Sequence, residues 1–298
     1  MIITEKESDC KCFRTDLALE LKEGGQSELM DVPCKIKEKD RCKISHITVP
    51  CYIQDTGMAP GEYITIEMPP LSDALDENNQ FLQVVSDEIK PFLPENGEVL
   101  VAGLGNAAIT PDALGEKVIA QILATRHVKK ELERITGVSE LRSVAAVSTD
   151  VLGNTGMETA EILKGLTQQL RPKAVIVIDA MAARSLERLG KTVQISTAGI
   201  APGAGVGNRR PQIDQTLLGV PVISIGVPTV VDAATVAVDL LGGEHVTDEE
   251  KEKLREMVSP NGAAMFVTPR EIDLLIQRGA RMIGMAINAA LNPLFYSQ

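Results

Sequence analysis

The feature that most constrains the fold is a set of continuous runs of valine, isoleucine and leucine, separated by helix-like stretches. These runs lie at 98–103, 143–148, 174–179 and 220–226. A strand that is apolar without alternation is buried on both faces, which is typical of a parallel layer covered by helices. The sequence therefore predicts an α/β fold, a single-domain α/β/α sandwich around a mixed, mostly parallel sheet.

Residues before position 70 follow a different pattern. Apolar and polar residues alternate at 43–49 and at 63–68, and two prolines follow the second run. Alternation is typical of half-exposed strands, so we expect an antiparallel portion at one edge of the sheet. The chain has no internal repeat and no low-complexity linker, which favours one domain over two.

Helix starts are predicted where a threonine is followed by an acid three residues later. This pattern occurs at 155–158, 229–232, 247–250 and 268–271. An apolar face predicts a helix over 72–92, and a further helix is expected to begin at Asp112 and end at His127. After Pro269, which suits a first helical position, the expected inward stripe consists of Ile272, Leu275, Ile276, Ile283 and Ile287.

Two of the apolar strands lead into aspartates. Asp179 ends the strand at 174–179, and Asp112 follows the strand at 98–103 after a short loop. Ligands of open parallel sheets bind beyond the carboxyl ends of the strands, so neighbouring strands would aim both carboxyls into one crevice. Two carboxyls in a crevice of low dielectric share one proton, which supplies an acid and a base for hydrolysis. Taken alone, Asp112 is better explained by the dipole of its helix.

The stretch 199–207 is rich in glycine. The main-chain N–H groups of Gly203, Gly205 and Gly207 are candidates to bind a carbonyl, an oxyanion or a phosphate. A tight connection between two strands explains the same glycines, and both interpretations stay open. Gly103 and Gly105 lack the third glycine of a dinucleotide-binding fingerprint.

Composition narrows the function classes. A net charge of −11 argues against a nucleic-acid partner. The chain has no apolar window long enough to span a membrane and its first residues lack the apolar core of a signal peptide. All five cysteines lie within the first 51 residues, at Cys10, Cys12, Cys34, Cys42 and Cys51. We interpret them as reduced thiols of a cytoplasmic protein, with a metal site at Cys10, Cys12 and Cys34 as the alternative. No histidine pair has metal-ligand spacing, so no metal and no cofactor is expected.

Several motifs, in order along nearly the whole chain, resemble those of germination proteases, the spore endopeptidases that degrade small acid-soluble spore proteins. They are 14–18, 101–106, 110–115, 125–127, 178–185, 203–208, 228–233 and 267–271. The resemblance implies an atypical aspartic endopeptidase with a fold like that of hydrogenase-maturation proteases. Its catalytic aspartates correspond to Asp112 and Asp179.

The resemblance also implies a self-processing zymogen that assembles as a homotetramer in the cytoplasm of the forespore. Residues 1–16 would be its propeptide and 17–298 its protease domain, with the cut between Asp16 and Leu17. The substrates would be small acid-soluble spore proteins. Arg184 is a candidate positioning cation, or else a member of a structural ion pair.

The chain departs from the family pattern at three places. Residues 196–200 lack an expected aspartate, Ala204 stands where a serine is common, and Thr149-Asp150 replaces a Pro-Gly pair. These changes bear on substrate contacts and oxyanion stabilisation more than on the aspartate pair. Two other functions stay open: a metal-assisted peptidase or maturation factor in which the aspartates are ligands, and a phosphate- or nucleotide-binding α/β protein.

Overall fold

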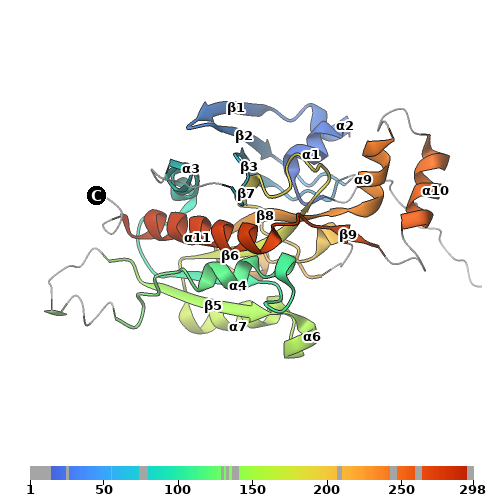
Figure 1. Cartoon of the computed structure of the whole chain (residues 1–298). Coiled ribbons are helices and arrows are strands. Elements are labelled where there is room, and N and C mark those ends of the chain that lie inside the picture. The colour runs from blue at the N-terminus through green and yellow to red at the C-terminus, as the bar shows by residue number, and fades with distance from the viewer. Residues whose placement is uncertain are drawn as a thin grey trace, which may run out of the picture.

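The chain folds around one large sheet. The computed structural model describes residues 15–24, 27–54, 56–73, 80–128, 131, 134–135, 141–206, 210–241, 247–258 and 264–293. Within them a nine-stranded sheet has the order β1-β2-β3-β7-β8-β6-β4-β5, and β9 pairs with β8 (Figure 1).

The strands are β1 (Cys34–Lys39), β2 (Cys42–Val49), β3 (Gly61–Glu67), β4 (Val99–Leu104), β5 (Val144–Asp150), β6 (Ala174–Ala183), β7 (Thr192–Ser196), β8 (Val222–Asp232) and β9 (Phe266–Val267). The α-helices are α1 (Ala18–Glu23), α2 (Ser27–Met30), α3 (Gln80–Ile89), α4 (Leu114–Ile119), α6 (Leu152–Thr155), α7 (Thr159–Leu170), α8 (Gln215–Leu218), α9 (Ala233–Leu240), α10 (Asp248–Val258) and α11 (Ile272–Leu291). Short 3-10 turns are η1 (Lys90–Phe92), η2 (Thr110–Asp112) and η3 (Ala204–Val206).

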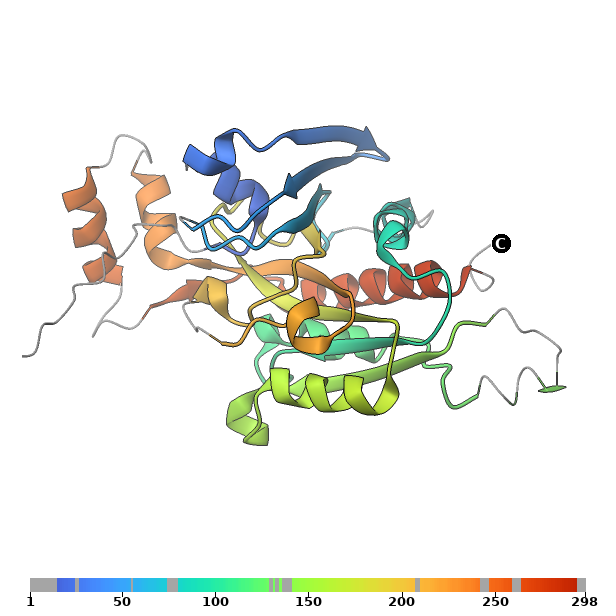
Figure 2. The same ribbon diagram turned by 180° about the vertical axis from the view of Figure 1, so that it is seen from behind.

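The four strands β8, β6, β4 and β5 pair in parallel and are covered on both faces. Figures 1 and 2 show α4 and α11 over one face and α7 over the other. Along β6, Ile176 and Ile178 join the core beneath α4 and α11, whereas Val175 and Val177 join the core beneath α7. This two-sided burial explains the continuous apolar runs, and the predicted α/β architecture with a mixed sheet is confirmed.

The other half of the sheet, β1-β2-β3-β7, is antiparallel and joins the parallel half where β7 pairs antiparallel with β8. The predicted antiparallel edge is therefore confirmed. Within the described chain, parallel pairing is confined to the four strands that carry the continuous apolar runs. The edge strand β1 reads Cys-Lys-Ile-Lys-Glu-Lys and is mostly exposed, and such charges discourage pairing with another chain.

Only one of the four predicted threonine caps is confirmed. Thr247 and Glu250 cap α10 reciprocally. At the start of α7 the capping residue is Glu158, which forms a capping box with Glu161. The helices α9 and α11 follow Asp232 and Glu271, so those two threonine predictions are wrong by three residues. In each of these three cases the acid, and not the threonine, precedes the first helical residue.

Other boundaries also differ from expectation. Asp112 lies in η2, α4 begins only at Leu114 and ends at Ile119, and His127 lies in a later turn. Four members of the inward stripe of α11 are buried as predicted, and Ile272 is half-buried. The apolar face of α3 is buried too, although part of 72–92 lies outside the described residues. No helix in the described part of the chain is long and apolar enough to cross a membrane.

Candidate active site

Asp112 is held by the turn that follows β4. Gly105 has a φ of 95°, a conformation that glycine adopts without strain. A methyl group at this position would lie 2.0 Å from the carbonyl oxygen of Asp112. The Asp112 carboxyl accepts a hydrogen bond of 2.9 Å from the N–H of Asn106. The two glycines near β4 therefore serve close packing, because a methyl group at Gly103 would also collide with the backbone at Gly115.

Asp179 lies inside β6 and not at its end, because β6 continues to Ala183. The pairing of β4 with β6 stops at Gly103 and Ile178, one residue before Asp179. On its other side β6 stays paired with β8, where Asp179 is opposite Gly226. The Asp179 side chain is 5% exposed, and its carboxyl accepts a hydrogen bond from the N–H of Ala180.

Asp112 and Asp179 line the same cavity, which has a volume of about 510 Å³. The convergence of these two carboxyls, expected from the two strand ends, is therefore present in the structure. Two further acids line the cavity: Asp16 before α1, and Asp150 at the end of β5. Arg210 is a basic residue in the lining, and it also forms an ion pair of 3.1 Å with Glu158.

The environment raises the pKa of both central carboxyls. Burial raises the pKa of Asp179 well above the usual value, and the charges of Asp112 and Asp16 add to this effect. Burial also raises the pKa of Asp112, with a smaller contribution from Asp150, while the hydrogen bond from Asn106 opposes the rise. Asp179 is thus the better place for a shared proton, and Asp112 is the better place for the negative charge.

Asp16 binds the chain that follows Asp179. Its N–H donates to the carbonyl oxygen of Ala182 over 2.9 Å, and its carboxyl accepts from the N–H of Ala182 over 2.8 Å. The N–H of Gly205 donates to the same carboxyl. Burial raises the pKa of Asp16 to about 6 despite these hydrogen bonds. The predicted cleavage position is therefore docked beside the two central aspartates.

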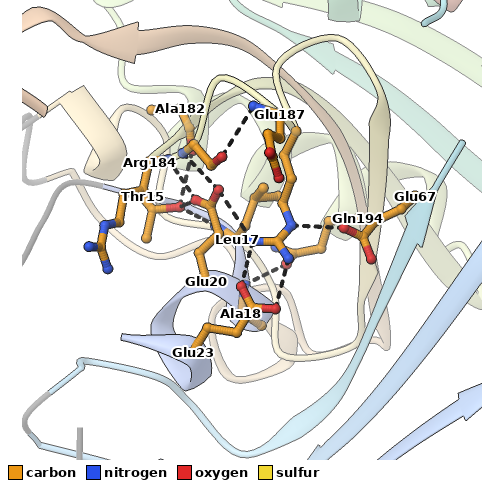
Figure 3. A network of polar contacts seen from close by, with 12 residues as sticks. Thr15, Leu17, Ala18, Glu20, Glu23, Glu67, Ala182, Arg184, Glu187 and Gln194 are labelled. Atoms are coloured by element: carbon orange, nitrogen blue, oxygen red, sulfur yellow. Dashed lines mark hydrogen bonds and ion pairs between the residues drawn. The ribbon is translucent and has the colours of Figure 1, made fainter. Parts of the chain in front are cut away.

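The residues after Asp16 are also fixed, as Figure 3 shows for Leu17, Ala18 and Glu20. Leu17 is fully buried in a cluster with Met181, Ala183, Leu189 and Val231. Gln194 forms hydrogen bonds of 2.7 Å with both the carbonyl oxygen of Asp16 and the N–H of Ala18. We call Thr15–Glu20 the docked segment.

Glu20 anchors the far end of the docked segment. Its buried carboxyl accepts hydrogen bonds from the main-chain N–H groups of Arg184 and Ser185, at 2.6 and 2.9 Å, and from the hydroxyl of Thr15. Arg188 lies 3.7 Å away and pairs more closely with Glu23 and Glu67. The segment is thus held at both ends, by Asp16 on Ala182 and by Glu20 on the loop after β6.

The remaining predicted site residues lie as follows. Gly203 lines the cavity, Gly205 is buried against Asp16, and Gly207 lies outside the described residues. A methyl group at Gly205 would lie 2.2 Å from the Asp16 carboxyl, so a side chain there would displace this carboxyl. Arg184 does not line the cavity and contacts Glu20 through its main-chain N–H.

No group of three or more histidine, cysteine, aspartate or glutamate side chains in the described residues is arranged to hold a metal ion. Among the described residues, Cys34, Cys42 and Cys51 form no disulfide bond, and Cys10 and Cys12 lie outside the described residues.

Three residues of this region escaped the sequence analysis. Asp150 was visible only as part of a departure from a family pattern. Neither the anchoring role of Glu20 nor the contacts of Gln194 gave a local signal, because the main-chain groups that they bind lie 164 or more residues away along the chain. Only the fold brings such pairs together.

Comparison with known proteins identifies the family of the chain. The family profile described as germination protease matches residues 14–243. A germination protease of Caldanaerobacter subterraneus subsp. tengcongensis is 44% identical over 94% of each chain. Those of Clostridium tetani and Priestia megaterium are 38% and 34% identical, and cover 94% and 97% of this chain and 95% and 96% of their own.

A solved structure similar to this one is the [NiFe] hydrogenase maturation protease HycI from Thermococcus kodakarensis. It is 16% identical, covers 68% of this chain and 98% of its own, and has a TM-score of 0.36. A likeness at this level assigns no function to the cavity.

Proposed function

This chain belongs to the germination protease family, and we propose that it is an endopeptidase that cleaves small acid-soluble spore proteins through Asp112 and Asp179. The protease class follows from the family. The observation that carries the aspartate mechanism is that both carboxyls line one cavity, where burial and the charge of Asp112 raise the pKa of Asp179.

In the proposed mechanism Asp112 is ionised and Asp179 holds a proton. Asp112 removes a proton from a water molecule, whose oxygen adds to the carbonyl carbon of the substrate. Asp179 donates a hydrogen bond to the carbonyl oxygen of the substrate. It then gives its proton to the leaving nitrogen as the C–N bond breaks. The products are a carboxyl and an amine, and the pair returns to its starting state by passing one proton from Asp112 to Asp179.

We further propose that the chain is made as a zymogen that cuts itself between Asp16 and Leu17, releasing residues 1–16. The docking of Asp16 in the cavity of Asp112 and Asp179 supports this order of events. Residues 17–298 would then form the single protease domain, a homotetramer in the spore core. The glycine stretch would contribute main-chain donors to the substrate, as Gly205 does to Asp16.

The proposal is tested with the full chain in mildly acidic buffer, followed by intact-mass measurement. We expect shortening between Asp16 and Leu17, and a single cut when a purified small acid-soluble spore protein is added. Asp112→Asn and Asp179→Asn should each slow both cuts by at least about 10³-fold, because each removes one half of the acid–base pair.

The matched control is Asp239→Asn, an exposed aspartate of α9, which should cut like the unmodified chain. Full activity of either central variant would overturn the aspartate mechanism. A cut that stops when a chelator is added, and resumes with a divalent metal, would instead support a metal-assisted peptidase.

A further inference from the structure

Gln194 forms hydrogen bonds with the main chain on both sides of the Asp16–Leu17 peptide bond. Its Nε2 donates to the carbonyl oxygen of Asp16 and its Oε1 accepts from the N–H of Ala18, both over 2.7 Å. The side chain is only 3% exposed. Because both ends of this buried amide form hydrogen bonds, the amide is held in one orientation and fixes the position of the Asp16 carbonyl group.

The sheet aligns Gln194 with Asp179. Both residues are paired with Gly226 of β8, Gln194 from β7 and Asp179 from β6. Residues opposite one another on neighbouring strands project from the same face, and neighbouring strands lie about 4.8 Å apart. The two side chains therefore rise from one row on the same face, with a residue lacking a side chain between them.

The side chain of Met181 fills the space above Gly226. A methyl group at Gly226 would lie 2.4 Å from the Met181 sulfur, and that sulfur is 4.0 Å from the Gln194 amide nitrogen. Leu17 packs in the cluster that contains Met181. Met181, two residues after Asp179 on β6, thus lies against both the Gln194 amide and the cluster that holds Leu17.

We infer that Gln194 is a further catalytic residue, whose Nε2–H stabilises the negative charge that forms on the carbonyl oxygen of the bond being cut. The inference rests on the proposed function, because it takes Asp16–Leu17 as a bond that the enzyme cleaves. When water adds to the carbonyl carbon, the electron pair of the C=O bond moves to the oxygen. Gln194 donates a hydrogen bond to this oxygen and exchanges no proton, and the oxygen returns the pair when the C–N bond breaks.

In this assignment the glycine stretch and β7 bind different groups of Asp16. The N–H of Gly205 is used by the Asp16 side chain, so the glycine stretch recognises the acidic residue before the cut. The carbonyl oxygen itself accepts from β7. Removing one donor from an oxyanion site typically costs about 10²–10³-fold in rate.

The test measures the rate of the self-cut in the full chain, by intact mass, for Gln194→Met. This change keeps the length and removes the donor, and we expect a rate about 10²–10³-fold lower. Gln212→Met is the matched control, because Gln212 is an exposed glutamine whose amide donates to the main-chain carbonyl oxygen of Ala198. It should cut at the unmodified rate.

A second variant separates catalysis from holding the segment. Ala18→Pro removes the N–H that contacts Oε1, at a first helical position where proline is tolerated. We expect less than about a tenfold loss, since the donor to the carbonyl oxygen remains. An equal loss in Ala18→Pro and Gln194→Met would overturn the inference, because Gln194 would then only hold the segment.

A wild-type rate in Gln194→Met would also overturn the inference. If that variant does not fold, Gln194→Asn keeps the buried amide and shortens its reach, and should show the same loss. Asp112→Asn and Asp179→Asn are run beside these variants. If they stop the cut while the Gln194 variants do not, the inference fails and the proposed function stands. If they still cut, the proposed function itself fails.

Discussion

At the scale of single residues, the position of Asp112 depends on a residue without a side chain. Gly105 combines a positive φ with an approach of its α-carbon to the Asp112 carbonyl that leaves no space for a methyl group. Gly156 also has a positive φ, of 71°, but nothing lies within 4 Å of a methyl group placed there. Substitution of Gly156 by alanine therefore introduces backbone strain alone, whereas substitution of Gly105 introduces both strain and a collision.

We predict that Gly105→Ala lowers the free energy of unfolding by about 3 kcal/mol, the sum of backbone strain and overpacking. The self-cut should slow as well, because Asp112 must move. Gly156→Ala should cost only about 1 kcal/mol and leave the cut unchanged. Denaturant unfolding and intact mass check both, and equal costs at the two positions would contradict this account of Gly105.

The meeting of Asp112 and Asp179 in one cavity was predictable because each follows a continuous apolar run in the sequence, and crevices form where strands of a parallel layer end. Gln194 was not predictable. A glutamine in a short strand is ordinary, and its neighbours in the sequence do not indicate its hydrogen bond to the Asp16 carbonyl oxygen, 178 residues earlier in the chain.

At the scale of elements, α1 is tied to the loop after β6 by one buried carboxylate. Glu20 is 3% exposed and accepts hydrogen bonds from two consecutive main-chain N–H groups, those of Arg184 and Ser185. A buried N–H left without an acceptor costs about 1–3 kcal/mol. This contact therefore fixes where the docked segment ends.

We predict that Glu20→Ala destabilises the protein by about 3 kcal/mol and exposes the amides of 17–22 to hydrogen exchange. Glu23→Ala is the control, because the Glu23 side chain is exposed and Arg188 keeps Glu67 as a partner when Glu23 is removed, so we expect a cost of about 1 kcal/mol. Calorimetry and exchange mass spectrometry measure both effects. Similar protection in the two variants would show that Glu20 is not the anchor.

Element starts were harder to predict than elements. The apolar stripe of α11 and the buried runs of β4, β5, β6 and β8 were recognisable because burial requires them. Three of four helix caps were placed too early, since a threonine and a following acid satisfy the same pattern whichever residue is the cap. The strand β7 was missed, because five residues with alternating polarity carry little signal.

At the scale of the whole molecule, we expect the seating of the docked segment to depend on pH. The carboxyl of Asp16 has a pKa of about 6 when docked, against 3.8 ordinarily. A raised carboxyl pKa means that docking is favoured by protonation. The contribution is complete below about pH 4, declines as pH rises toward 6, and is lost above it.

We predict that the seated fraction relative to the unseated fraction falls by up to about 100-fold between pH 4 and pH 7. Hydrogen exchange at Leu17 and Ala18 measures this change. Asp16→Asn keeps an acceptor for the N–H of Ala182 and cannot ionise, so its exchange should lose this pH dependence. A dependence that persists in Asp16→Asn would assign it to another group.

The docked segment and the carboxyl pair belong to one polypeptide, which fixes the kinetic order of processing. An intramolecular reaction meets its target at an effective concentration that dilution does not alter. The half-time of the self-cut should therefore be the same in a dilute and in a concentrated solution. Each molecule would be converted at a rate that does not depend on encounters with other copies.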